Sequence, residues 1–223
     1  MDKLNPAGKG IRLAIVDDHP SVREGLRALL ERAGGFEICG LAGDVPEAIK
    51  MISQVSPDVV IMDISLENEN SLDLIRRLKA KNGTIRILAW SMFDDLVYAE
   101  RALAAGAMGF INKREATQRI IAAIHKVMDG EVYLSEKMAS HMIHRSVGGR
   151  PRNGQTPIET LSDRELEVFR MIGNGMTTAE ISRALHLSVK TVETHRQRIK
   201  DKLQIKDASK LVREAAQWVL ENG

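Results

Sequence analysis

The sequence predicts two folding units: a doubly wound α/β domain with a five-stranded parallel sheet, and a small all-α domain after it. Short apolar segments alternate with amphipathic ones through the first half of the chain, a Gly- and Pro-rich stretch follows, and only helical periodicity remains beyond it. The length of 223 residues suits two domains of about 100–150 residues each.

The strand signals are short segments that are rich in β-branched residues and almost continuously apolar. Such segments are typical of parallel strands that are buried on both faces of a sheet. The five predicted strands are residues 11–16, 36–42, 58–62, 85–90 and 109–111.

Amphipathic segments separate these strands. In the first of them, Val22, Leu26, Leu29 and Leu30 form the apolar stripe of a helix that packs one face against a core. Strand–helix alternation of this kind indicates a flavodoxin-like, doubly wound sheet with helices on both faces. The predicted helices are residues 21–33, 46–55, 71–81, 96–105 and 115–128.

The second half carries no strand signal. A further helix is predicted at 135–144, and the segment GGRPRNGQTPIET at 148–160 has the composition of a linker. We therefore expect an α/β domain at 10–130, a helix and flexible linker at 131–160, and a helical domain at 161–223. The helices predicted in that last domain are residues 163–172, 177–185, 188–203 and 208–220.

The composition excludes several classes of protein. The chain is 43% hydrophobic and 28% charged, as is usual for globular proteins and unlike disordered or fibrous ones. No apolar run approaches the roughly 20 residues of a membrane span, and residues 1–10 lack the apolar core of a signal peptide, so we expect a cytoplasmic protein. Cys39 is the only cysteine and cannot form an internal disulfide.

Carboxylates gather where the predicted strands end. Asp17 and Asp18 follow the first strand and Asp63 follows the third, and in the flavodoxin-like strand order these two strands are neighbours. Converging carboxylates repel one another unless a cation neutralises them, and oxygen ligands suit Mg²⁺. An Asp beside such a cation can accept a phosphoryl group, whose oxygens Ser91 and Lys113 at the next two strand ends could bind.

Each of these residues also has a simpler interpretation. Asp17 could cap the helix that begins near Pro20, Ser91 could be a loop hydroxyl, and Lys113 could be a solvated surface charge. Matching polar groups at four strand ends favour the shared site.

At this point a family resemblance becomes visible. The segments IRLAIVDDHP, PDVVIMDI, ILAWS and GFINK resemble those of receiver domains in two-component signalling, over about residues 10–130. The resemblance implies Asp63 as phosphoacceptor, Asp18 as a direct Mg²⁺ ligand and Asp17 as a ligand through water. It also implies the backbone carbonyl of Ser65 as a metal ligand, and Ser91 and Lys113 as phosphoryl-binding residues.

Two positions need comment against the receiver pattern. Phe110 stands where the family has an aromatic switch residue, although a plain core aromatic is the alternative. The loop at 66–71 lacks the family's Met-Pro-Gly turn and carries additional carboxylates, so Glu67 could approach the metal or repel a phosphodonor.

The last domain contains a helix–turn–helix pattern at 177–203. Residues 188–206 hold six basic and two acidic residues. On the second helix Val192 and Ile199 share an apolar stripe, while Lys190 and Gln197 lie nearly opposite. Such a helix can enter the DNA major groove. His195 lies between the two faces and is either a packing residue or a phosphate contact.

The same segment is similar to the LuxR/FixJ-type helix-turn-helix over about residues 158–223, through Leu161–Glu165, Gly175, Glu180, Thr191 and His195 among others. The resemblance implies three groups of residues. Base-facing residues would be Glu193, Thr194 and Gln197, and phosphate contacts would be Thr178, Lys190, Thr191 and Arg198. Leu211, Ala215, Val219 and Leu220 would lie on a dimerisation helix, with core packing as the alternative.

Together the two resemblances imply a DNA-binding response regulator of the NarL/FixJ class. A sensor histidine kinase would phosphorylate Asp63, which would control homodimerisation and sequence-specific DNA binding to regulate transcription, with RNA polymerase as a further candidate partner. A turnover enzyme is not expected. A phosphohydrolase with an aspartyl-phosphate intermediate stays open as a weaker alternative. The nucleophilic aspartate of such an enzyme would follow the first strand, whereas the candidate acceptor Asp63 follows the third. The main alternative is an atypical regulator that binds DNA independently of phosphorylation and uses its receiver only to dimerise.

Overall fold

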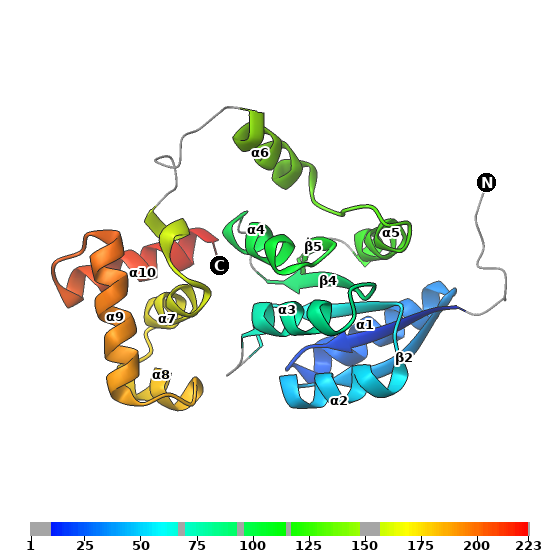
Figure 1. The fold of residues 1–223 in the computed structure, drawn as a ribbon, viewed down its shortest axis with the longest axis horizontal. Helices are drawn as coiled ribbons and strands as arrows, with labels where there is room; N and C mark the ends of the chain where they lie inside the picture. Colours follow the sequence, from blue (N-terminus) through cyan, green and yellow to red (C-terminus); the bar gives the residue numbers. More distant parts are fainter. Residues whose placement is uncertain (1–9, 67–69, 93–95, 115–116, 148–156, 223) are drawn as a thin grey trace. The chain divides into compact units, whose positions relative to one another are not determined.

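The computed structural model describes residues 10–66, 70–92, 96–114, 117–147 and 157–222 (Figure 1). The chain divides into two compact units whose main boundary falls between Glu136 and Lys137. No helix in these described ranges combines the length and apolar character that crossing a membrane requires.

The first unit confirms the predicted five-stranded parallel sheet. Its strand order is β2-β1-β3-β4-β5, the flavodoxin-like order in which β1 is flanked by β2 and β3. In chain order the elements are β1 (Ile11–Val16), α1 (Pro20–Ala33), β2 (Phe36–Ala42), α2 (Val45–Val55), β3 (Val59–Asp63), α3 (Ser71–Lys81), β4 (Arg86–Ser91), α4 (Leu96–Ala105), β5 (Gly109–Asn112) and α5 (Thr117–Met128).

Alternate residues of each strand serve opposite faces of the sheet. On one face Leu13, Ile61 and Leu88 meet Leu30 of α1 and Ile124 of α5 in a single buried cluster. Helices α2 and α3 pack side by side, with α2 also against β2 (Figure 1). This two-sided burial explains why the central strands read as continuous apolar runs.

The observed element ends lie close to the predicted ones. The bounds of β1, β2, α3 and α4 are as predicted, whereas the other helices and strands differ by one to three residues where their bounds are described. The predicted start of α5 at Glu115 lies outside the described residues. Asn70 caps α3 by accepting from the backbone N–H groups of Leu72 and Asp73, which explains why this helix begins at Ser71.

The second unit is helical. Its elements are α6 (Glu136–Val147), the 3₁₀-helix η2 (Pro157–Thr160), α7 (Asp163–Gly173), α8 (Thr178–Ala184), α9 (Val189–Leu203) and α10 (Ala208–Asn222). Residues 148–156 of the predicted linker lie outside the described part of the chain. Its last four residues form η2 instead of linker, because Lys202 of α9 donates to the carbonyl of Thr160 and draws this segment onto the domain.

Helices α7, α9 and α10 share the core of this unit. Phe169 of α7 and Trp218 of α10 pack with ring centroids 5.9 Å apart. Gly173, the last residue of α7, lies so close to α10 that an added Cβ would stand 2.4 Å from the carbonyl oxygen of Ala215 and 2.6 Å from Cγ2 of Val219. Only a residue without a side chain fits this contact.

We predict that Gly173→Ala lowers the free energy of unfolding of the second unit by about 1–3 kcal/mol, because the methyl group forces two helices apart. Urea unfolding can be followed by Trp218 fluorescence in a Trp90→Phe background, since each unit contains one of the two tryptophans. Gly25→Ala in the helix α1 of the first unit is the control for the substitution itself, and its unfolding is followed by Trp90 fluorescence in a Trp218→Phe background. Its Cβ meets nothing within 4 Å, so it should be neutral or slightly stabilising. Equal effects of the two changes would contradict the packing argument.

Candidate phosphoacceptor site and nucleic-acid interface

The carboxyl ends of β1 and β3 bring the predicted carboxylates together. The strands are paired with Val16 opposite Met62, so Asp17 follows beside Asp63, the last residue of β3. Ligand atoms of Asp17, Asp18, His19 and Asp63 all lie within 4.8 Å of one another. His19 was missed by sequence reasoning, although an imidazole directly after two aspartates was a visible signal.

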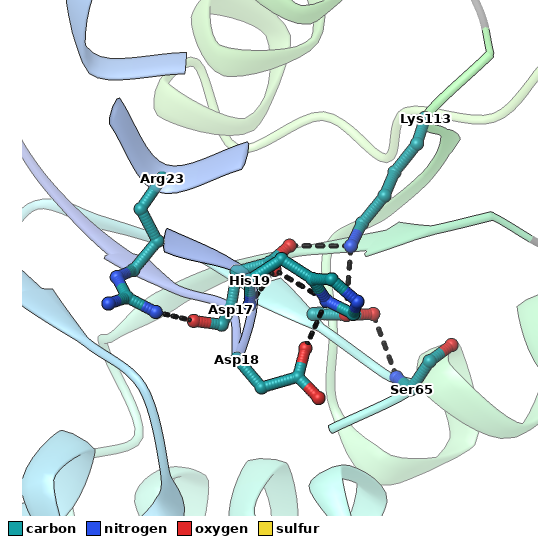
Figure 2. Close-up of polar contacts among 7 residues, drawn as sticks. Asp17, Asp18, His19, Arg23, Ser65 and Lys113 are labelled. Atoms are coloured by element: carbon teal, nitrogen blue, oxygen red, sulfur yellow. Dashed lines mark hydrogen bonds and ion pairs between the residues drawn. The ribbon is translucent and has the colours of Figure 1, made fainter. Parts of the chain in front are cut away.

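Lys113 reaches into this cluster from the end of β5. Its Nζ lies 2.5 Å from Oδ2 of Asp17 and 2.8 Å from Oδ2 of Asp63 (Figure 2). The Lys113 side chain is only 6% exposed, so the interpretation as a solvated surface charge is wrong. The backbone N–H of Lys113 donates to the carbonyl of Ser91, which ties the ends of β4 and β5 together.

The buried charges of Asp63 and Lys113 shift each other's pKa values. Burial raises the pKa of Asp63, and the nearby Asp17 carboxylate adds to the rise, while the Lys113 ammonium opposes it. Burial alone would lower the pKa of Lys113, but the charges and hydrogen bonds of Asp63 and Asp17 raise it overall. Lys113 therefore stays protonated, and the site holds one buried cation against two buried carboxylates.

The turn after β1 is held by its own side chains. Oδ1 of Asp17 accepts from the backbone N–H of His19, and Nδ1 of His19 lies 2.6 Å from Oδ1 of Asp18. Arg23 of α1 donates to the Asp17 carbonyl (Figure 2). The interpretation of Asp17 as a helix cap is wrong, because the N-cap of α1 is His19 and the Asp17 carboxylate faces Lys113.

The remaining predicted residues of this unit differ in their burial and contacts. The backbone N–H of Ser65 donates to Oδ1 of Asp63, and the Ser65 hydroxyl is buried without a partner. Ser91 is fully buried as the last residue of β4, so it is a strand residue and not a loop hydroxyl. Phe110 of β5 is also buried, as a core aromatic would be. Glu67 lies outside the described residues.

The donor set fits a divalent cation. Asp17, Asp18 and Asp63 offer carboxylate oxygens, which Mg²⁺ prefers, and Asp18 is less buried than the other two. Lys113 supplies one positive charge, which leaves the two buried carboxylates with a residual negative charge. A hard cation at Asp18 would neutralise it.

The second candidate site lies on α8 and α9. Ser188 caps α9, and the turn before it contains His186 with a positive φ of 51°. Val192 and Ile199 are fully buried, which orients the opposite side of α9 outward. The predicted DNA-facing residues of α9 are exposed apart from the half-buried Thr191: Lys190, Glu193, Thr194, Gln197 and Arg198.

Beside that surface lie one residue whose role the sequence left open and one that sequence reasoning missed. His195 is half-buried with Nδ1 enclosed and unpaired, and burial lowers its pKa, so the structure favours a packing role. Val189 at the start of α9 is 52% exposed and was missed. Its signal in the sequence was an apolar residue directly before Lys190 on the predicted DNA-facing helix.

The last helix separates buried from exposed apolar residues. Leu211 and Ala215, both predicted to dimerise, are fully buried and pack the domain's own core. Val219 is half-buried beside Gly173, whereas Val212 and Leu220 are 42% and 81% exposed. A partner can therefore reach Val212 and Leu220 but not Leu211 or Ala215.

Two family models match this chain. The response regulator receiver domain matches residues 13–125, and the LuxR family of bacterial regulatory proteins matches residues 159–215. The first match spans the acidic cluster, and the second spans α8 and α9.

Several known bacterial proteins resemble the chain over most of its length. A putative transcriptional regulator of Pseudomonas aeruginosa is 35% identical over 202 residues, which cover 90% of this chain and 95% of that one. Response regulator UvrY of Escherichia coli is 32% identical over 87% of this chain and 88% of its own. RcsB of Salmonella enterica serovar Typhimurium, solved bound to the promoter rprA with the phosphomimetic BeF₃⁻, superposes with a TM-score of 0.67 at 23% identity. It covers 93% of this chain and 99% of its own, and supports the fold.

We predict that Asp63→Asn raises the free energy of unfolding near pH 8 by on the order of 1 kcal/mol. The change removes one of two adjacent buried carboxylates, and Lys113 still forms its ion pair with the other, Asp17. The raised pKa means that the folded protein binds a proton at Asp63 more tightly than the unfolded chain does. Wild-type stability relative to the variant therefore falls as the pH rises above the ordinary value of 3.8.

Urea titrations between pH 4 and pH 8 measure this difference. Glu37→Gln is the control, because Glu37 forms an exposed ion pair 3.7 Å from Arg12 and should change little at any pH. A variant advantage that shrinks as the pH rises would contradict the prediction.

We also predict that millimolar Mg²⁺ raises the unfolding temperature of the wild type, because a cation that binds only the folded protein stabilises it. At a free Mg²⁺ concentration of about a hundred times the dissociation constant, the free energy of unfolding rises by about 2.7 kcal/mol. Asp18→Asn should reduce the shift, and excess EDTA should reverse it. Asp73→Asn, an exposed carboxylate on α3, should keep the wild-type shift. Equal shifts in the two variants would place the cation elsewhere.

Proposed function

This chain belongs to the response regulators that join a receiver domain to a LuxR-type DNA-binding domain, the NarL/FixJ class, and from that membership we propose that phosphoryl transfer to Asp63 controls its binding to DNA. The chain is a signalling regulator of transcription, and its families are not enzyme families. The observation that carries the proposal is the Asp63 carboxylate, buried between Lys113 and the Asp17–Asp18 turn.

The phosphoryl donor is a sensor histidine kinase. A carboxylate oxygen of Asp63 forms the new P–O bond as the P–N bond to the kinase histidine breaks. Asp17, Asp18, Asp63 and the Ser65 carbonyl would hold Mg²⁺, which would supply charge neutralisation when bound. Lys113 pairs with one phosphoryl oxygen, and the Ser91 hydroxyl donates to another. Positioning and charge are the protein's whole contribution to this transfer.

Phosphorylation changes the charge that Lys113 must balance. A phosphoryl group brings about two negative charges near pH 7, in place of the single charge of Asp63. The buried ion pairs of Lys113 with Asp17 and Asp63 must then rearrange. We assign Ser91 and Phe110, at the ends of β4 and β5, as the residues that carry this change into a second conformation of the domain.

The output of that conformation is DNA binding by a homodimer. The exposed apolar residues Val212 and Leu220 of α10 support a partner contact there. A two-fold dimer binds two half-sites about one helical turn apart. On each half-site Lys190, Thr191 and Arg198 hold phosphates, while Glu193, Thr194 and Gln197 face base edges. The exposed Val189 can contact a thymine methyl group.

We predict that Asp63→Asn abolishes phosphorylation by acetyl phosphate, because an amide oxygen is not a nucleophile for phosphorus at neutral pH. Incorporation can be measured by intact-protein mass, where one phosphoryl group appears on the wild type. Asp73→Asn is the control and should be phosphorylated normally. Phosphorylation of Asp63→Asn at the wild-type level would remove Asp63 from its assigned role.

A DNA-binding titration on genomic fragments tests the link between phosphorylation and output. Wild type should bind more tightly with phosphodonor than without, whereas Asp63→Asn should be indifferent to it. Tight wild-type binding that ignores the phosphodonor would favour the atypical regulator that binds DNA independently of phosphorylation.

A further inference from the structure

A hydrogen bond joins the two helices of the candidate DNA interface. The hydroxyl of Thr178, the first residue of α8, donates to Oε1 of Glu193 on α9 over 2.7 Å. Thr178 is half-buried, whereas the Glu193 side chain is 58% exposed. By contrast, Thr194 and Gln197 form their hydrogen bonds within α9, to the Lys190 carbonyl and to Asp201.

We propose that Thr178 is a positioning residue that aims the Glu193 carboxylate at a cytosine in the major groove. The inference rests on the proposed function, because it needs α9 to lie in that groove. It assigns a base to Glu193 and replaces the expectation that Thr178 contacts a phosphate.

The hydrogen-bonding capacity of Thr178 supports this change of role. A threonine hydroxyl has one proton to donate, and phosphate oxygens only accept. Thr178 therefore cannot donate to Glu193 and to a phosphate at the same time. Its proton is already committed to the carboxylate in the free protein, so keeping that bond requires no rearrangement when DNA docks.

Fixing Glu193 in advance helps recognition. A free glutamate loses up to about 2 kcal/mol of rotamer entropy when it is ordered, and a bond made before docking removes part of that cost. The alternative partner of Glu193 is Arg196, whose Nε lies 3.8 Å from the same Oε1. Without the Thr178 hydroxyl, the carboxylate is free to turn toward that cation and away from the groove.

The chemistry of a carboxylate selects the base. Ionised glutamate only accepts hydrogen bonds, and the second oxygen of Glu193 remains available beside the one that Thr178 holds. Guanine and thymine present acceptors in the major groove and repel a carboxylate. Adenine offers its amino group next to the N7 acceptor, whereas cytosine offers its amino group without such a neighbour. Cytosine is therefore the preferred partner.

The test is selection from a randomised DNA library with phosphodonor-treated full-length protein, followed by affinities for the selected site and for its cytosine-to-thymine variant. Wild type should select a cytosine in each half-site and prefer it at least fivefold over thymine. Glu193→Gln and Thr178→Val should both lose most of that preference. Thr178→Ser keeps the hydroxyl and should retain it.

Lys190→Ala is the control for a phosphate contact. It should weaken binding to both sites equally and reduce the salt dependence of the affinity. Circular dichroism and thermal unfolding verify that each variant is folded, and Thr178→Ser keeps the test informative if Thr178→Val is not.

Two outcomes would overturn the inference while leaving the proposed function standing. Equal weakening of both sites by Thr178→Val would make Thr178 a phosphate contact. A wild-type preference for another base at the position that Glu193→Gln alters would remove cytosine as the partner. If wild-type protein shows no sequence-specific binding, the proposed function fails, and this inference fails with it.

Discussion

Lys113 is the residue on which the phosphoacceptor site depends. Asp17 and Asp63 are buried at adjacent strand ends, and two unpaired carboxylates in such surroundings would cost several kcal/mol each. β5 is separated from β1 by β4 and β3 in the sheet, so the Lys113 ammonium crosses the carboxyl edge to reach both. One cation thus ties three strand ends together and keeps the carboxylates close enough to share a metal.

This arrangement makes the site responsive to charge. The pKa of Asp63 is raised by burial, while Asp18 lies at the more exposed side of the cluster. A group that alters the charge on Asp63 competes for the same ammonium that holds Asp17. The shortage of positive charge in the buried part of the site is the physical basis of the proposed sensitivity to phosphorylation.

A comparable ion pair, between Lys202 and Glu165, joins helices within the DNA-binding unit. Lys202 of α9 lies 2.6 Å from the buried carboxylate of Glu165 on α7 and also donates to the carbonyl of Thr160 in η2. Burial opposes ionisation of Glu165, but the bonds from Lys202 and Ser162 lower its pKa overall. The recognition helix is thereby joined to the segment through which the chain enters this domain.

The sequence by itself determined the strands, the helices, the order of the two domains and the aspartates of the acidic cluster. Apolar periodicity and the pair of aspartates after Val16 are local patterns, and the adjacency of the first and third strands followed from the predicted flavodoxin-like topology. The tertiary structure alone decided the burial of the Lys113 side chain, the core position of Leu211 and Ala215, the 3₁₀-helix at Pro157–Thr160 and the bond from Thr178 to Glu193. Each of these depends on a partner distant in the chain, and the energy of a contact between distant residues is set by their separation in space, which local sequence patterns do not contain.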